Sequence, residues 1–196
     1  EDLFAQLPIP AKLLDALANP ISGPKSAAML SALSVPFVFV AELLAVAVLF
    51  VLPLSVGLPI LIVLIAAIEE LAKSLHVYAG FARSRYDRGL RSAAVVGAAS
   101  GTGFFLAEKL AVVVQVVGLA ELDLGRAAFQ LGAGTGGSAS PPILAGLFLA
   151  PLALHVATAG TSAIGASRSR RAYAAALVVA VAVHAAYNLT VVTALG

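Results

Sequence analysis

Long apolar stretches alternate with short polar segments along most of the chain. Each stretch is long enough to cross a bilayer, because a spanning helix needs about 20 mostly apolar residues. The stretches cover residues 28–51, 54–82, 92–118, 143–166 and 172–195. We therefore predict an all-α fold, a polytopic transmembrane helix bundle of about five spans.

The first residues do not share this pattern. Residues 1–27 mix apolar with charged side chains and are interrupted by Pro8, Pro10 and Pro20. This mixture is typical of a short amphipathic helix at the membrane interface, with a disordered tail as the alternative. We expect two parts, an N-terminal interfacial or cytoplasmic segment over 1–27 and a single transmembrane helical domain over 28–196.

The composition agrees with a membrane protein. The chain is 61% hydrophobic and only 11% charged, with a mean hydropathy of +1.02, whereas soluble domains carry about 25% charged residues. The absence of cysteine excludes disulfides, a cysteine nucleophile and cysteine-bound metal. No basic run is interleaved with aromatic residues, so we expect no nucleic-acid partner.

Two strongly basic loops predict the orientation of the bundle. They cover residues 83–91 and 167–171 and are separated by two spans, so they lie on the same side. Basic loops favour the cytoplasm. We expect an integral protein of the plasma membrane with a cytoplasmic N-terminus.

Ionisable and amide side chains interrupt four of the apolar stretches. Each charge deep in a bilayer costs roughly 3 kcal/mol, so such residues are functional candidates. They are Glu69, Glu70, Glu108, His155, His184 and Asn188. Counted from the basic loops, they fall within about 6 Å of one another in depth. We predict one polar layer near the middle of the bilayer, in which these side chains face each other.

Helical spacing groups several of these residues. Lys73 lies four residues after Glu69, and Asn188 lies four after His184, so each pair shares a helix face. Phe104 and Glu108 share a face in the same way. Glu69 and its neighbour Glu70 point about 100° apart and cannot do the same work. We expect one to be catalytic and the other structural, and the spacing does not say which.

These residue types support several chemistries. A carboxylate can accept a proton from water, while histidine and asparagine can stabilise an oxyanion. Two histidines and one glutamate can also hold a catalytic zinc with an open fourth position. Buried Glu and His chains also mark proton relays, so an ion-coupled transporter is an alternative. A scaffold in which the polar layer only specifies helix packing is a third.

Three further polar residues lie inside the apolar stretches. Lys73 is expected to act as a structural counter-ion, and His76 lies near the cytoplasmic interface with no expected catalytic role. Glu42 lies at a depth comparable with the polar layer, seventeen residues after Lys25, and could face the same cavity.

Four motifs in order resemble the PrsW family of intramembrane proteases. They are a Glu-Glu-x-x-Lys, a Phe-x-x-x-Glu, an isolated His and a His-x-x-x-Asn. In this chain they read IEELAK (68–73), FFLAEK (104–109), LHVATAG (154–160) and VHAAYNLT (183–190). No motif covers Glu42. The family is similar to the wider group of CAAX endopeptidases and bacteriocin-processing proteases.

The resemblance implies an intramembrane endopeptidase with a glutamate-activated water. Glu69 or Glu70 would be the base, His155 and His184 would polarise the scissile carbonyl or hold the water, and Asn188 would support them. Members have also been classed as metalloproteases. Zinc is therefore possible, though not favoured.

The resemblance also implies ligands, partners and a departure from the wider group. The zinc ligands would be Glu70, His155 and His184. Glu108 stands where the wider group has a histidine, and Phe104 and Lys73 would support the site. The expected partners are membrane lipid and a membrane-anchored protein substrate such as an anti-sigma factor. No oligomeric state is predicted.

Overall fold

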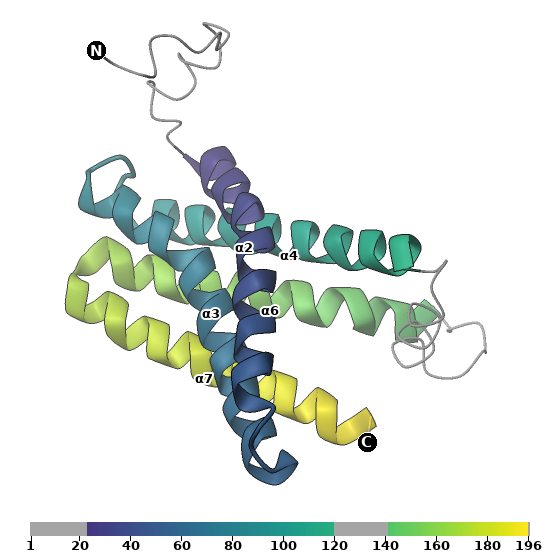
Figure 1. Ribbon diagram of the computed structural model, residues 1–196. Coiled ribbons are helices and arrows are strands. Elements are labelled where there is room, and N and C mark those ends of the chain that lie inside the picture. Colours follow the sequence, from purple (N-terminus) through teal and green to yellow (C-terminus); the bar gives the residue numbers. More distant parts are fainter. Residues whose placement is uncertain (1–22, 120–140, 196) are drawn as a thin grey trace, which may run out of the picture.

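The computed structural model describes residues 23–119 and 141–195, and within these ranges it is helical with no strand (Figure 1). The helices are α2 (Pro24–Leu49), α3 (Leu54–Ala82), α4 (Leu90–Leu119), α6 (Pro141–Arg168) and α7 (Arg170–Leu195). Each contains a segment long and apolar enough to cross a membrane. The predicted bundle of five transmembrane helices is confirmed.

The helix bounds differ little from the apolar stretches. The largest difference is at α2, which starts at Pro24 and so includes the last residues of the predicted N-terminal segment. Proline suits the first turn of a helix because its missing N–H has no partner there. The predicted interfacial helix itself falls on residues 1–22, outside the described residues.

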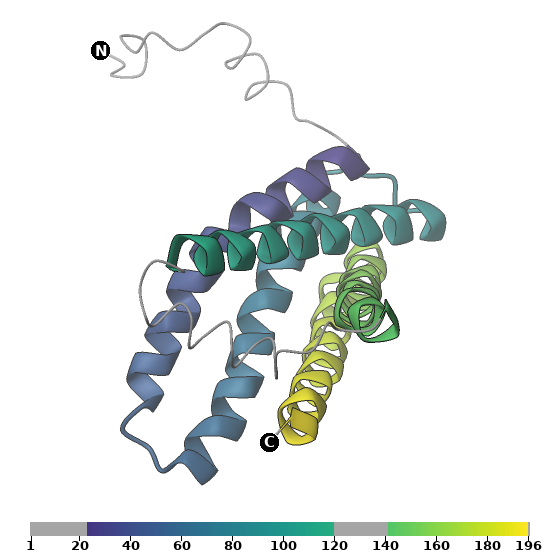
Figure 2. The same ribbon diagram turned by 90° about the vertical axis from the view of Figure 1, so that its right-hand side faces the viewer.

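The helices form two crossing groups. Figure 1 shows α4, α6 and α7 as a row that the α2–α3 hairpin crosses, and Figure 2 shows α2 and α3 side by side. Within the described chain, α3 packs against every other helix. Residues on α3 can therefore reach groups on all the others, and this helix carries Glu69, Glu70 and Lys73.

The turns after α3 and after α6 lie at the same end of the molecule, on the left in Figure 1. Both carry exposed arginines, which are Arg83, Arg85, Arg88, Arg91, Arg168, Arg170 and Arg171. The backbone N–H of Ala172 donates to Ser169 Oγ at 3.1 Å, which caps the start of α7. The two basic loops thus share one side, as predicted, and their cytoplasmic location stays a prediction.

Glycines on α4 let neighbouring helices approach at backbone distance. A Cβ on Gly97 would lie 2.6 Å from the Ala159 carbonyl oxygen on α6. A Cβ on Gly101 would overlap the His155 carbonyl on α6, and one on Gly103 would overlap that of Ala28 on α2. At Gly101 this close approach fixes the backbone that carries His155.

Candidate active site

Lys73 is at the centre of the site. Its side chain is fully buried, and its Nζ donates to Glu70 Oε1 at 2.5 Å and to His155 Nδ1 at 2.7 Å. A lysine ammonium has no acceptor, so Lys73 is the donor in both bonds. Its Nζ also lies 5.0 Å from the centroid of the buried Phe104 ring, a geometry that favours a cation. One ammonium therefore joins α3 to α6.

Glu70 accepts hydrogen bonds from several helices through one oxygen. Besides Lys73, His184 Nδ1 lies 2.7 Å from Glu70 Oε1, and Thr158 Oγ1 lies 3.0 Å from it. The carboxylate is fully buried. An oxygen with these partners is held firmly as an anion. Glu70 thus joins α3, α6 and α7 and has the geometry of an anchor.

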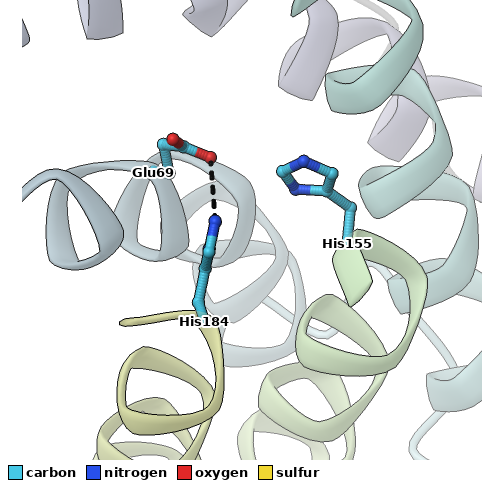
Figure 3. Close-up of side chains that lie close together, drawn as sticks. All are labelled: Glu69, His155 and His184. Carbon is cyan, nitrogen blue, oxygen red and sulfur yellow. Dashed lines mark ion pairs between the residues drawn. The ribbon is translucent and has the colours of Figure 1, made fainter. Parts of the chain in front are cut away.

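The bond to Glu70 sets the hydrogen positions of His184. Because a carboxylate can only accept, Nδ1 of His184 carries the proton, and the neutral ring then has a lone pair on Nε2. That Nε2 lies 3.7 Å from Glu69 Oε2 (Figure 3). Two acceptors therefore face each other, and a donor such as water can satisfy both.

His155 has the opposite arrangement. Since Lys73 donates to its Nδ1, the neutral ring carries its proton on Nε2. This nitrogen lies 3.1 Å from Glu108 Oε2. The ring of His155 meets that of His184 edge-on, with centroids 5.3 Å apart. His155 can therefore donate a hydrogen bond from Nε2, the ring nitrogen that lies on the side of Glu108.

Three carboxylate oxygens in the site are buried without a hydrogen-bond partner in the described structure, Glu69 Oε2, Glu70 Oε2 and Glu108 Oε2. For Glu108 the 3.1 Å separation from His155 is short, but its direction is not that of a hydrogen bond. The other oxygen of Glu108 is paired with Lys109 Nζ at 2.6 Å. The side chain of Glu69 as a whole is 12% exposed, although its Oε2 is buried.

Not every predicted residue joins this constellation. Asn188 is half-buried on α7, and the described part of the chain gives its side chain no hydrogen bond. His76 instead contacts the Ala72 and Ala27 carbonyl oxygens at 3.2 and 3.1 Å and ties α3 to α2. The expectation that His76 has no catalytic role stays a prediction.

Two hydroxyl groups near Glu70 were not among the predicted site residues. Thr158 lies three residues after His155 on the same face of α6, a spacing that could have identified it. Ser74 Oγ donates to the Glu70 carbonyl oxygen at 2.6 Å and lies 2.9 Å from Tyr173 Oη. Hydroxyls are common in membrane helices, so neither residue carried a strong signal.

One group of side chains has the composition of a zinc site. A donor atom from each of Glu69, His155 and His184 lies within 4.8 Å of the others, and this donor set is typical of catalytic zinc. It contains Glu69 in place of the predicted Glu70, whose Oε1 is already bonded to three donors. The Nδ1 of His184 is bonded to the Glu70 carboxylate. Metal-bound histidines commonly have such a carboxylate partner on the ring nitrogen that does not bind the metal.

His155 does not fit such a zinc site. Binding through Nε2 would require a proton on Nδ1, where it would oppose the Lys73 ammonium, donor against donor, at 2.7 Å. Binding through Nδ1 would require Lys73 to leave. The hydrogen bonds around His155 therefore do not suit a bound zinc ion, although the residue types of the group are those of a zinc site.

The close approach at Gly101 gives a prediction. We expect Gly101→Ala to lower both the thermal midpoint and the activity, because a Cβ there would push the His155 backbone away from α4. A displacement of about 1 Å at a catalytic group can cost about 10²-fold in rate. Gly160→Ala on α6 is the matched control, since nothing lies within 4 Å of its Cβ. Equal behaviour of the two variants in unfolding and cleavage assays would contradict the prediction.

Comparison with known proteins identifies a family. A family model described as PrsW family intramembrane metalloprotease matches residues 25–196. No curated protein and no solved structure matches the chain. The matched region includes all the described helices except the first residue of α2.

Proposed function

Because the chain belongs to the PrsW family of intramembrane proteases, we propose that it hydrolyses a peptide bond of membrane-anchored protein substrates with a water activated by Glu69. One observation carries the choice of base. Glu69 Oε2 is buried without a partner and faces the Nε2 lone pair of His184 at 3.7 Å. A water that donates to both atoms would have its oxygen free to attack a carbonyl carbon.

The alternative base, Glu70, is less suited to this step. Its Oε2 also lacks a partner in the described structure, but its Oε1 is bonded to donors from three helices, and a carboxylate stabilised in this way is a weak proton acceptor. Glu69 has fewer partners, and its nearest ammonium, Lys73, is 4.0 Å away. We assign proton transfer to Glu69 and the anchoring of Lys73 and His184 to Glu70.

The reaction then follows from the positions of these groups. Glu69 takes a proton from the water as the water oxygen bonds to the carbonyl carbon, and the carbonyl oxygen becomes an oxyanion. His155 donates to this oxyanion from Nε2, and the Lys73 ammonium on its Nδ1 strengthens that donor. Glu69 finally gives the proton to the leaving amine as the C–N bond breaks. Asn188 supports the oxyanion by analogy with the family motif.

The first test is cleavage of single-span membrane proteins, including anti-sigma factors, by the purified chain in proteoliposomes. We expect the rate to be unchanged by a strong chelator and the purified protein to contain far less than one zinc per chain, because Lys73 already bonds to His155 Nδ1. Mass spectrometry should place the cut inside the substrate's membrane segment.

The zinc form of the reaction is the second candidate, favoured by the Glu69, His155 and His184 group. Loss of cleavage in chelator, with recovery on added zinc, would establish it and refute the glutamate mechanism. Cleavage of no substrate in the panel would contradict the proposed substrate class.

A further inference from the structure

A small apolar hollow lies between α3 and α7, next to the proposed site. It has a volume of about 150 Å³ and is open on one side. Its lining residues are all apolar, Pro59, Ile62 and Val63 on α3 and Ala185, Ala186 and Leu189 on α7. Val63 and Leu189 are about half exposed, so the hollow opens toward the lipid around the bundle.

The hollow is continuous with the site. Ala185 directly follows His184 on α7. Ile62 lies seven residues before Glu69, so the two residues share one face of α3 and are about 10 Å apart along the helix axis. Ile62 and Ala185 belong to one buried apolar cluster. An extended peptide that is cut at Glu69 would reach the hollow after about three residues, because a strand rises about 3.3 Å per residue.

The size and the rim of the hollow suit a side chain of a peptide. A cavity of about 150 Å³ with apolar walls is large enough for benzene, so leucine or phenylalanine fits and tryptophan is too large. At the rim, Pro59 has no N–H, and the carbonyl oxygen of Ser55 therefore lacks its usual helical donor. A peptide backbone can donate an N–H to this oxygen, whereas a lipid acyl chain has no donor.

We propose that the hollow binds one apolar side chain of the substrate's membrane segment, of the size of leucine or phenylalanine, about three residues from the bond that is cut. The proposal rests on the proposed proteolytic function and adds to it a preference for one substrate residue. Lipid surrounds an apolar side chain as well as protein does, so the preference comes from shape and contact and not from the removal of water. We therefore expect a selectivity of about tenfold, at the low end for an apolar pocket.

The test measures kcat/KM in proteoliposomes for a single-span substrate with alanine, leucine or tryptophan at each position two to four residues from its cut. At one of these positions the wild type should prefer leucine by about tenfold. Ala186→Leu fills the hollow and should abolish this preference, whereas Val63→Ala enlarges the hollow and should improve cleavage of the tryptophan substrate. Ala182→Leu is the matched control, one turn earlier on α7 at an exposed residue outside the lining, and should keep the wild-type selectivity.

Two results of this assay would overturn the proposal. One is a wild type without a preference at any of these positions, and the other is an Ala186→Leu variant with the wild-type selectivity. Either would leave a lipid acyl chain or a second copy of the chain as the occupant of the hollow. Leucine is favourable in a bilayer helix, so Ala186→Leu should fold, and its thermal midpoint verifies this.

A cross-linking measurement separates this proposal from the one on which it rests, because it needs no hydrolysis. The substrate carries photoreactive leucine in its membrane segment and is irradiated together with Glu69→Gln protein in proteoliposomes. Mass spectrometry should place the adducts on residues 59–63 and 185–189, and adding Ala186→Leu should lower their yield several-fold. Adducts only elsewhere would overturn the binding role of the hollow. Adducts at the hollow with a substrate that the wild type does not cut would support that role and count against the proteolytic function.

Discussion

Replacing Glu69 with glutamine is expected to lower kcat by about 10²–10⁴-fold, the usual contribution of a general base, and to leave the protein folded. Glutamine has almost the same shape but cannot accept the proton from water. Glu69 Oε2 has no hydrogen-bond partner in the described structure, so the substitution breaks no bond at that atom. The measurement is kcat and KM in proteoliposomes, together with the thermal midpoint of the purified variant.

Glu69→Asp is a useful companion to this variant. It keeps a carboxylate but withdraws it by one methylene, so it should retain part of the activity that Glu69→Gln loses. A kcat of Glu69→Gln within tenfold of wild type would place the base elsewhere. A large fall in its thermal midpoint would instead make Glu69 a structural residue.

Glu70→Gln is expected to lose both activity and stability. The substitution leaves the Lys73 ammonium buried without its carboxylate, and removing one partner of a buried ion pair costs about 3–5 kcal/mol. It also weakens the bond that orients His184. Denaturant titration in mixed micelles measures the stability, and the cleavage assay measures the activity.

A second substitution identifies the cause of that instability. In Glu70→Gln/Lys73→Met both charges are removed, so most of the lost stability should return, while cleavage stays absent because His155 and His184 lose their orientation. If Glu70→Gln unfolds at the wild-type denaturant concentration, Glu70 is not the anchor that its hydrogen bonds indicate. The contrast between Glu69→Gln and Glu70→Gln thus shows which of the two adjacent glutamates is the base and which is the anchor.

Much of this arrangement could be predicted from the spacing of a few polar residues in apolar stretches. The depth count placed Glu70, His155 and His184 in one layer because the rise of a helix per residue is nearly constant. In the structure, Glu70 contacts His184 directly and reaches His155 through Lys73.

The roles of Glu69 and Glu70 could not be predicted, because they depend on how α3 is rotated relative to α6 and α7. Adjacent residues point about 100° apart, but the sequence does not say which direction faces His184 Nδ1. That rotation depends on helix packing over many residues, including the contact of Gly101 with the His155 backbone. The depth of a residue in the bilayer follows from counting along the chain. The direction in which its side chain points from the helix axis depends on tertiary packing.

The ion pair between Glu70 and Lys73 lies within α3, whereas His155 and His184 belong to helices made later. During synthesis α3 therefore reaches the bilayer before either histidine has been translated. Its two charges, each costing roughly 3 kcal/mol alone, neutralise one another across a single turn. Insertion of α3 can thus proceed without later helices, while the contact of Glu70 with His184 forms only after α7 has been made.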